Sequence, residues 1–142
     1  MNENSPTLFY NDANQHVSKM VNIRIANTNS PWLSSVQTGD IFTIPVSHGE
    51  GKFVVSEEEF RILRDNGQIF SQYVDFSGKP SMDSKFNPNG STCAIEGIIS
   101  RNGQILGKMG HSERVEEGLF QNIPGTKDQQ LFVNAVKYFT EV

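Results

Sequence analysis

The chain has 142 residues, 36% hydrophobic and 10% aromatic, which suits one domain with a modest core. Its 12 basic and 16 acidic residues give a net charge of −4 without a dense Lys/Arg run, which argues against a nucleic-acid or anionic-membrane surface. The sequence shows neither a bilayer-length apolar run nor a secretory signal at Met1, and its single Cys93 excludes an internal disulfide, so a cytoplasmic protein is expected.

The first part of the chain predicts a loop followed by strands. Residues 1–16 are polar and lack periodicity, so a loop or a linker is expected there. Residues 20–26 alternate apolar and polar side chains, which is typical of a strand. Residues 41–47 form a second apolar run, in which Pro45 predicts either an edge position in the sheet or an irregularity. The glycine-rich HGEG that follows predicts a turn before the chain becomes extended again.

The middle of the chain predicts one short helix and another strand. The run Ser-Glu-Glu-Glu from Ser56 is a capping box that begins a helix, and Gly67 suits the left-handed residue after its end. Residues 68–76 predict a strand. Residues 87–91, NPNGS, are dense in turn formers and predict a loop.

The last part of the chain predicts a hairpin and a terminal helix. Asn102-Gly103 predicts a tight turn between strands at 92–100 and 104–110. The terminal helix is expected from about Thr126, where Thr-Lys-Asp-Gln forms a second capping box. Its apolar stripe comprises Leu131, Phe132, Ala135, Val136 and Phe139. Taken alone these elements predict an α+β fold, or the second half of a larger α/β sheet.

His111 and Glu113 are the residues best placed for chemistry. In an extended backbone, residues two apart point to the same side, so the carboxylate can bind one ring nitrogen and fix the tautomer. The other nitrogen is then free to deprotonate a thiol or a hydroxyl. On the spacing alone, a histidine at a strand end beside a solvated glutamate is the alternative.

A second His-x-Glu pair, His48 and Glu50, lies in the glycine-rich turn. Gly49 and Gly51 permit unusual backbone angles and the close approach of a ligand, which suits a substrate wall, although a plain surface turn is an equal alternative. The two His-x-Glu pairs together could also bind zinc or iron in a metal-dependent enzyme. Neither a helical His-Glu-x-x-His nor a Cys-x-x-Cys accompanies them.

Cys93 is a poor candidate for a nucleophile. It is expected at the start of a buried strand, without the strained strand-to-helix elbow and the helix N-terminus that activate a thiol. The chain therefore shows a base with its orienting carboxylate but no nucleophile to activate.

Three stretches follow one another along the chain: IPVSHGEGKFV, then NPNGS followed by AIEGIIS, and finally GKMGHSERVEEGLF. In this order they resemble the C-terminal part of the glutaminase domain of phosphoribosylformylglycinamidine synthase. The resemblance runs from about Asn14 to the terminal helix, and the long fused form of the enzyme looks closer than the separate small subunit. It implies that residues 1–142 are one partial domain, the C-terminal portion of an α/β, flavodoxin-like class I glutamine amidotransferase. Its sheet would be mixed and largely antiparallel, with one short helix and one C-terminal helix.

The resemblance also implies roles for residues. The catalytic triad of this family is Cys, His and Glu, and its Pro-His-Pro-Glu-Arg-like motif maps onto residues 110–114. His111 would be the general base and Glu113 its orienting partner, although Gly110 and Ser112 stand where prolines are usual. The family cysteine belongs to an earlier elbow that this sequence lacks. The chain is therefore expected to be a fragment that is inactive alone.

In the intact enzyme the resemblance implies that the domain hydrolyses glutamine. The ammonia would supply the ATP-dependent conversion of formylglycinamide ribonucleotide to formylglycinamidine ribonucleotide in de novo purine biosynthesis, so the full-length protein would be a ligase. Glutamine would be held by Ser47, His48 and Gly49. The fragment would carry no cofactor, because ATP and magnesium would bind in the synthase part.

The expected partners are glutamine and the upstream glutaminase and synthase segments of the same protein, with neither nucleic acid nor a membrane. Non-native self-association through an exposed sheet edge is a further expectation. A non-catalytic binding or interface module is the alternative function, beside the metal-dependent enzyme.

Overall fold

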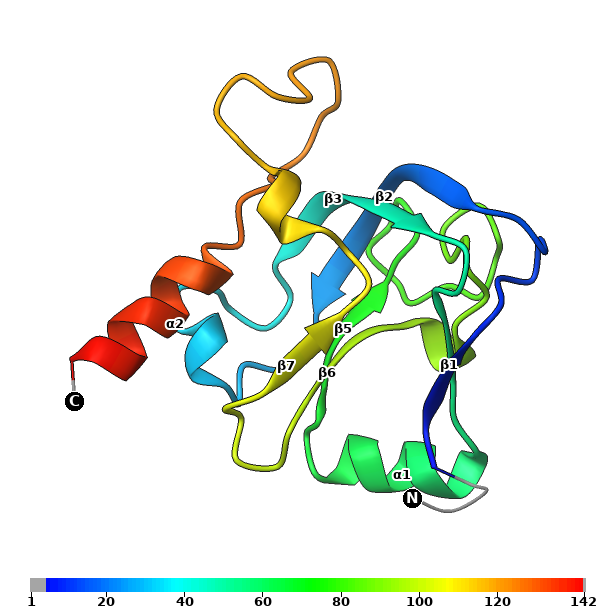
Figure 1. Ribbon diagram of the computed structural model, residues 1–142, viewed down its shortest axis with the longest axis horizontal. Helices are drawn as coiled ribbons and strands as arrows, with labels where there is room; N and C mark the ends of the chain where they lie inside the picture. The colour runs from blue at the N-terminus through cyan, green and yellow to red at the C-terminus, as the bar shows by residue number, and fades with distance from the viewer. Residues whose placement is uncertain (1–4, 142) are drawn as a thin grey trace.

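A computed structural model describes residues 5–141 as two antiparallel sheets, two α-helices and three short turns of 3-10 helix (Figure 1). The larger sheet has five strands in the spatial order β3, β2, β5, β6, β7. Their bounds are Ile41–His48 for β3, Val17–Ile25 for β2, Ile69–Tyr73 for β5, Ile95–Ile99 for β6 and Leu106–Lys108 for β7. All four pairings are antiparallel, so the predicted largely antiparallel sheet with a short helix and a C-terminal helix is confirmed.

The main core forms around β2 and β3. The alternation along β2 turns Val21, Ile23 and Ile25 inward, and none of the three is more than 4% exposed. Burying each such side chain stabilises the fold by about 1.5–3 kcal/mol. β3 lies at one edge of the sheet, which is the first of the two alternatives predicted from Pro45. A proline suits an edge because it has no backbone N–H to donate to a further strand.

A second apolar cluster lies under α1 (Glu57–Asp65), which joins β4 (Lys52–Val54) to β5. The predicted capping box is present in part, because the Ser56 hydroxyl accepts a hydrogen bond from the Glu59 N–H at 3.2 Å. Gly67 takes the predicted left-handed conformation after the end of the helix, with a φ of +64°. The Gly67 N–H donates to the Arg64 carbonyl and the Gln68 N–H donates to the Leu63 carbonyl. This pair of hydrogen bonds defines a Schellman motif.

The terminal helix α2 spans Leu131–Thr140 and begins about one turn later than the sequence predicts. The Thr-Lys-Asp-Gln box is not a cap, so that prediction is wrong. The Thr126 carbonyl instead accepts a hydrogen bond from the Thr43 N–H of β3 at 2.7 Å. This long-range bond keeps Thr126 beside the sheet and outside the helix. The residue before the helix, Gln130, has a φ of +52° and offers no side-chain cap.

Two further predictions for single segments need correction. Residues 1–16 are not simply a loop, because Thr7–Phe9 forms β1, an antiparallel partner of β4 in the second sheet. No local periodicity reveals this strand, since its three residues are all exposed and its partner lies far along the chain. The strand expected at 92–100 begins only at Ile95, because Cys93 and Ala94 take left-handed backbone angles in the turn η2 (Thr92–Ala94). The loop predicted for residues 1–4 lies outside the described residues.

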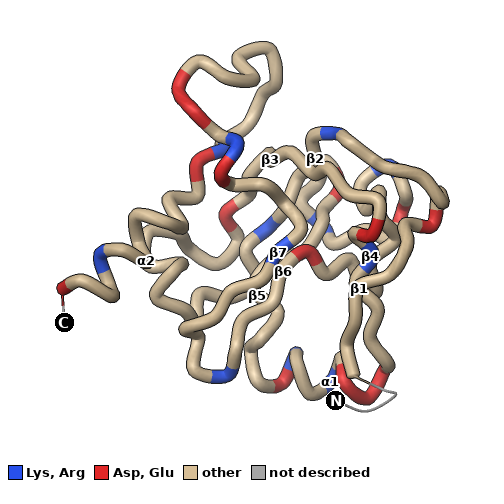
Figure 2. Tube along the Cα trace, in the orientation of Figure 1, with Lys and Arg blue, Asp and Glu red and all other residues tan. Residues whose placement is uncertain are grey.

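The segment between η3 (Ser112–Arg114) and α2 projects from the body of the molecule (Figure 1). Lys and Arg residues are spread along the trace, and acidic residues occur both in the projecting segment and at the start of α1 (Figure 2). Among residues 5–141, neither α-helix is long and apolar enough to cross a membrane.

Candidate active site

The predicted contact between His111 and Glu113 is present. The Nδ1 atom of His111 lies 2.6 Å from Oε1 of Glu113. Partial burial opposes ionisation of Glu113, but its own backbone N–H and the hydrogen bond and charge of His111 outweigh this and lower the pKa of the carboxyl. An ionised carboxylate can only accept, so Nδ1 carries the proton and donates it to the bond.

The backbone that makes this contact is not the extended one predicted. β7 ends at Lys108, and His111 is the residue before η3, the 3-10 turn that carries Glu113. The chain therefore curls back and brings the carboxylate to the ring. The His111 N–H donates to the Pro45 carbonyl at 2.8 Å, which ties this turn to β3.

The other ring nitrogen of His111, Nε2, is buried and has no hydrogen-bond partner among residues 5–141. Because Nδ1 holds the proton of the neutral ring, Nε2 is a bare acceptor. A buried polar atom without a partner is uncommon in proteins and requires an explanation. The arrangement suits a base whose proton donor comes from outside the described residues.

His48 lies directly beside His111. The two rings are stacked, with centroids 4.8 Å apart and an interplanar angle of 12°. The His48 Nε2 lies 2.5 Å from the Met109 carbonyl, which can only accept, so this nitrogen carries a proton. His48 thus covers one face of the His111 ring with its own orientation fixed.

The predicted substrate residues do not all lie together. Successive residues of a strand point to opposite sides, and Ser47 accordingly meets His16 at 2.9 Å while His48 meets His111. Gly49 has open space where a side chain would be. Of the three, His48 lines the cleft of about 370 Å³ at His111. The other lining residues are Trp32, Leu106, Gly107, Lys108, Met109, Gly110, Ser112, Glu113, Leu131 and Phe132.

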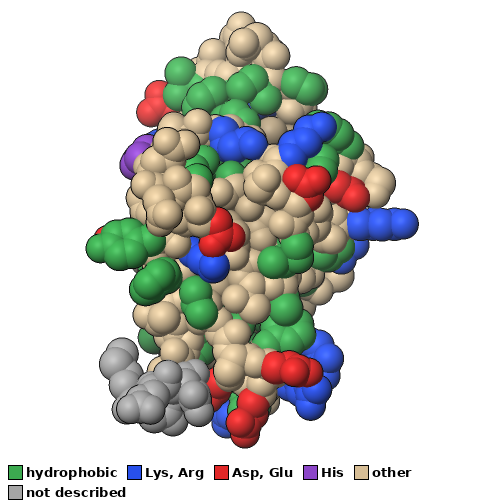
Figure 3. Space-filling model, turned by 90° about the vertical axis from the view of Figure 1, so that its right-hand side faces the viewer, with side chains coloured by type: hydrophobic (Ala, Val, Ile, Leu, Met, Phe, Trp, Pro, Cys, Tyr) green, Lys and Arg blue, Asp and Glu red, His purple; other side chains and the backbone are tan. Residues whose placement is uncertain are grey.

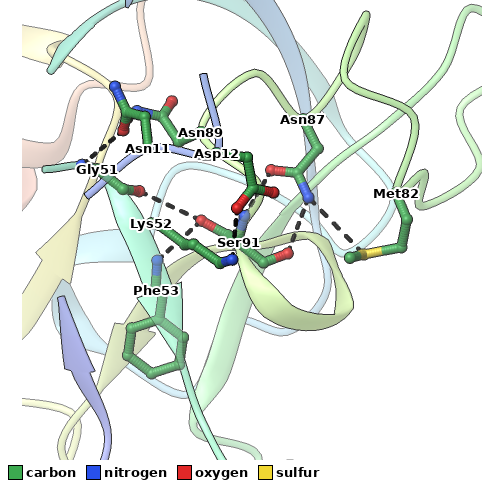
Figure 4. Close-up of polar contacts among 9 residues, drawn as sticks. All are labelled: Asn11, Asp12, Gly51, Lys52, Phe53, Met82, Asn87, Asn89 and Ser91. Carbon is green, nitrogen blue, oxygen red and sulfur yellow. Dashed lines mark hydrogen bonds and ion pairs between the residues drawn. The ribbon is translucent and has the colours of Figure 1, made fainter. Parts of the chain in front are cut away.

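A buried polar cluster holds the turn that follows His48 (Figure 4). The side chain of Asn11 donates to the His48 carbonyl at 2.6 Å, and its oxygen accepts from the Gly51 N–H at 2.9 Å. The same oxygen accepts from the Asn89 amide at 2.7 Å, which brings in the NPNGS loop. Ser91 of that loop accepts from the Phe53 N–H at 3.1 Å. The NPNGS segment is thus a buried clamp on the turn.

The prediction that the two glycines of the turn provide unusual backbone angles is wrong. Neither has a positive φ, so unusual backbone angles are not the reason for them. A Cβ on Gly51 would lie 2.2 Å from the Asn89 amide nitrogen, so Gly51 permits close packing of the clamp and not the approach of a ligand. Gly49 has no neighbour within 4 Å of such a Cβ.

Cys93 lies apart from His111. It packs against the cluster under α1 and does not line the His111 cleft. Burial raises the pKa of its thiol, and the charge of Glu57 adds to the effect, which disfavours the reactive thiolate. These features are the opposite of an activated nucleophile.

The two His-x-Glu pairs do not form a metal site. His48 and His111 are adjacent, yet among residues 5–141 no three His, Cys, Asp or Glu side chains converge in a way that could hold a metal ion. The metal-dependent hypothesis therefore has no ligand set in the part of the chain that the structure describes.

Sequence reasoning missed a buried ion pair next to His111. Glu96 on β6 is 2% exposed, and its carboxylate lies 3.6 Å from the ammonium of Lys108 on β7. An acid within the apolar run 94–99 is the signal that could have revealed it, since a buried charge requires a partner.

The chain belongs to the CobB/CobQ-like glutamine amidotransferase domain family, whose model matches residues 1–139. Its relatives include phosphoribosylformylglycinamidine synthase subunit PurQ of Aquifex aeolicus, which is 37% identical over 109 residues, covering 77% of this chain and 47% of the relative. PurQ of Methanosarcina mazei is 35% identical over 120 residues, covering 84% of this chain and 50% of the relative.

A solved structure shares the fold. The structure of PurLQS from Thermotoga maritima matches with a TM-score of 0.68 at 22% identity, over 95% of this chain and 53% of that one. The chain spans about half the length of the curated relatives it matches. The resemblance inferred from the three sequence stretches is confirmed. The relatives named here are separate subunits, and the greater similarity to the fused form stays a prediction.

Proposed function

We propose that this chain is the C-terminal part of a glutaminase domain of phosphoribosylformylglycinamidine synthase, with His111 as general base and Glu113 as its orienting carboxylate. The bare, buried Nε2 of His111, opposite the Nδ1–H bond to Glu113, is the observation that carries the proposal. An imidazole fixed in this tautomer accepts a proton at Nε2, and the carboxylate stabilises the imidazolium that forms.

The nucleophile in this mechanism is a cysteine on an upstream segment of the domain. His111 Nε2 takes the thiol proton, the thiolate attacks the side-chain amide carbon of glutamine, and the imidazolium returns the proton to the departing ammonia. Water, deprotonated at Nε2, then hydrolyses the thioester to glutamate. His48 lies against His111 and is the proposed side-chain contact for the amino-acid part of glutamine, with the backbone of its neighbours Ser47 and Gly49 completing the proposed site. The chain alone is then inactive.

The ammonia would pass to a synthase active site elsewhere in the full-length protein, which would be a ligase. There ATP and magnesium would support the conversion of formylglycinamide ribonucleotide to formylglycinamidine ribonucleotide in purine biosynthesis. The PurQ relatives and the fold shared with the PurLQS structure support synthase and glutaminase segments as the partners of this chain. A cytoplasmic location belongs to the same proposal.

Ammonia release from glutamine tests the proposal. We expect none from the isolated chain, and release when the cysteine-bearing upstream segment is supplied in fusion. In the fused protein, His111→Ala should lower the rate by about 10²–10⁴-fold, the usual contribution of a general base. Cys93→Ser is the matched control and should leave the rate unchanged.

Two results would contradict the proposal. Ammonia release by the isolated chain would show that the nucleophile is within it. Full activity of the fused protein with both His111 and Glu113 changed to Ala would instead favour a non-catalytic binding or interface module.

A further inference from the structure

Lys108 is a buried cation at the end of β7, immediately before the turn that carries His111. Its side chain is 10% exposed. Its ammonium donates to the Ser112 hydroxyl and to the Gln129 amide oxygen, both at 2.8 Å, and faces the Glu96 carboxylate at 3.6 Å. Burial lowers the pKa of Lys108, and the Glu96 charge opposes that change. The ammonium therefore donates two hydrogen bonds and forms an ion pair with Glu96, and these three partners come from different segments.

Glu96 holds the other side of the same turn. One carboxylate oxygen accepts the Gly110 N–H at 2.6 Å, and the other accepts the Ser71 hydroxyl of β5. The backbone carbonyl of Glu96 accepts the Met109 N–H at 3.0 Å. Gly110, the residue before His111, is therefore hydrogen-bonded to Glu96 of the ion pair. Ser112, the residue after His111, is hydrogen-bonded to Lys108.

Residues 110 and 112 use groups that a proline would not provide. A proline at 110 would lack the N–H that Glu96 accepts, and a Cβ there would lie 1.9 Å from Cδ1 of Ile44. A proline at 112 would lack the hydroxyl that Lys108 and Gln129 bind. Hydrogen bonds to one buried ion pair thus fix the backbone turn on both sides of His111.

We propose that Glu96 and Lys108 are positioning residues, whose buried ion pair holds residues 110 and 112 so that His111 keeps its Nδ1–H on Glu113 and its Nε2 free. Calling them positioning residues of a glutaminase rests on the function proposed above. Their effect on the tautomer of the His111 ring is independent of that function, because it can be observed without any reaction.

Long-range ¹H–¹⁵N spectra of the three histidines test this directly on the 142-residue chain. At a pH where the rings are neutral, we expect His111 to show the single tautomer with Nδ1 protonated. Lys108→Met keeps the length of the side chain and removes the ammonium, so it should convert His111 to a mixture of tautomers. The His16 signals in the same spectrum serve as an internal reference.

A purely stabilising role predicts another result. In that case Lys108→Met would lower the melting temperature, while the His111 signals of the folded chain would stay as in the wild type, and the proposal would be overturned. Lys52→Met is the matched control, because it removes an ion pair with Asp12 at the surface and should leave the His111 tautomer unchanged.

If Lys108→Met does not fold, Ser112→Ala decides. This change leaves the ion pair in place and cuts its bond to the His111 turn, so a mixture of tautomers supports the proposal and an unchanged ring overturns it. Failure of the proposed function would appear differently, as full ammonia release by the fused His111→Ala protein with the spectra still as expected here.

Discussion

Two aromatic residues have a buried polar atom without a partner among residues 5–141, His111 at Nε2 and Tyr73 at its hydroxyl. In the function proposed above, an upstream segment would supply the proton donor for the His111 atom. Tyr73 lies fully buried on β5, and no such role follows for it. Burial raises the pKa of Tyr73 well above its usual value, and the charge of Glu96 adds to the shift.

Tyr73→Phe should therefore stabilise the chain by about 1 kcal/mol, because it removes a buried hydroxyl that has lost its bonds to water. As pH rises past the usual tyrosine pKa, the unfolded chain releases the phenolic proton while the folded chain retains it. The unfolded state then binds fewer protons, so stability falls with rising pH. Urea unfolding at neutral and alkaline pH should show a smaller alkaline loss in Tyr73→Phe. The exposed Tyr138→Phe is the control, and an equal alkaline loss in all three proteins would contradict the argument.

At the scale of elements, the same sequence motif leads to different structures at the two helices. Ser56 caps α1 because its hydroxyl meets a free N–H in the first turn. Thr126 is the first residue of a second capping-box sequence, but its carbonyl accepts a hydrogen bond from β3. The helix α2 begins five residues later, at Leu131. Capping signals are local, so a competing long-range hydrogen bond can override them.

Ser56→Ala and Thr126→Ala separate these two cases. Loss of a helix N-cap typically costs about 1 kcal/mol, so Ser56→Ala should lower the free energy of unfolding by that amount. Thr126→Ala removes an exposed side chain that caps no helix and should change it by less than about 0.5 kcal/mol. Equal losses in urea titrations of the two variants would mean that Thr126 caps a helix in solution.

At the scale of the whole molecule, Asn11 joins the start of the chain to its middle. Its side chain bonds to Gly51 and to Asn89, which lies 78 residues away in the sequence. Asn11→Ala would leave several buried polar groups without partners and should destabilise the chain by about 2–3 kcal/mol in thermal or urea unfolding. Asn122→Ala, at an exposed position of the projecting segment, is the control. A loss as small as that of the control would show that the clamp contributes little.

Apolar side chains also remain on the surface, on both β1 and α2. Phe9, Val136 and Phe139 are each at least half exposed, and Figure 3 shows hydrophobic side chains on the face that carries β1 and β4. β7 is an unpaired edge of the five-stranded sheet among the described residues. Such surfaces favour association in water.

We therefore expect the isolated chain to self-associate as its concentration rises in sedimentation velocity runs. Val136→Glu should weaken this association if α2 takes part, whereas Ile62→Glu on α1 is a control for the added charge. A chain that stays monomeric throughout would contradict the expectation.

The sequence by itself determined the features that depend on a few neighbouring residues. The cap of α1, the hairpin at Asn102-Gly103 and the alternation along β2 are of this kind. Each is set by side chains within one turn or one strand of each other. The three motif stretches likewise sufficed to indicate the family.

Only the tertiary structure decided the rest. The pairing of β1 with β4, the late start of α2, the Asn11 clamp and the Glu96–Lys108 ion pair all join segments that are distant in the sequence. The sequence predicts an extended backbone at His111, whereas a 3-10 turn anchored to β3 and to that ion pair brings Glu113 to the ring. The physical reason is that burial makes an unpaired hydrogen-bonding group costly, so its partner is set by whichever segment folds against it.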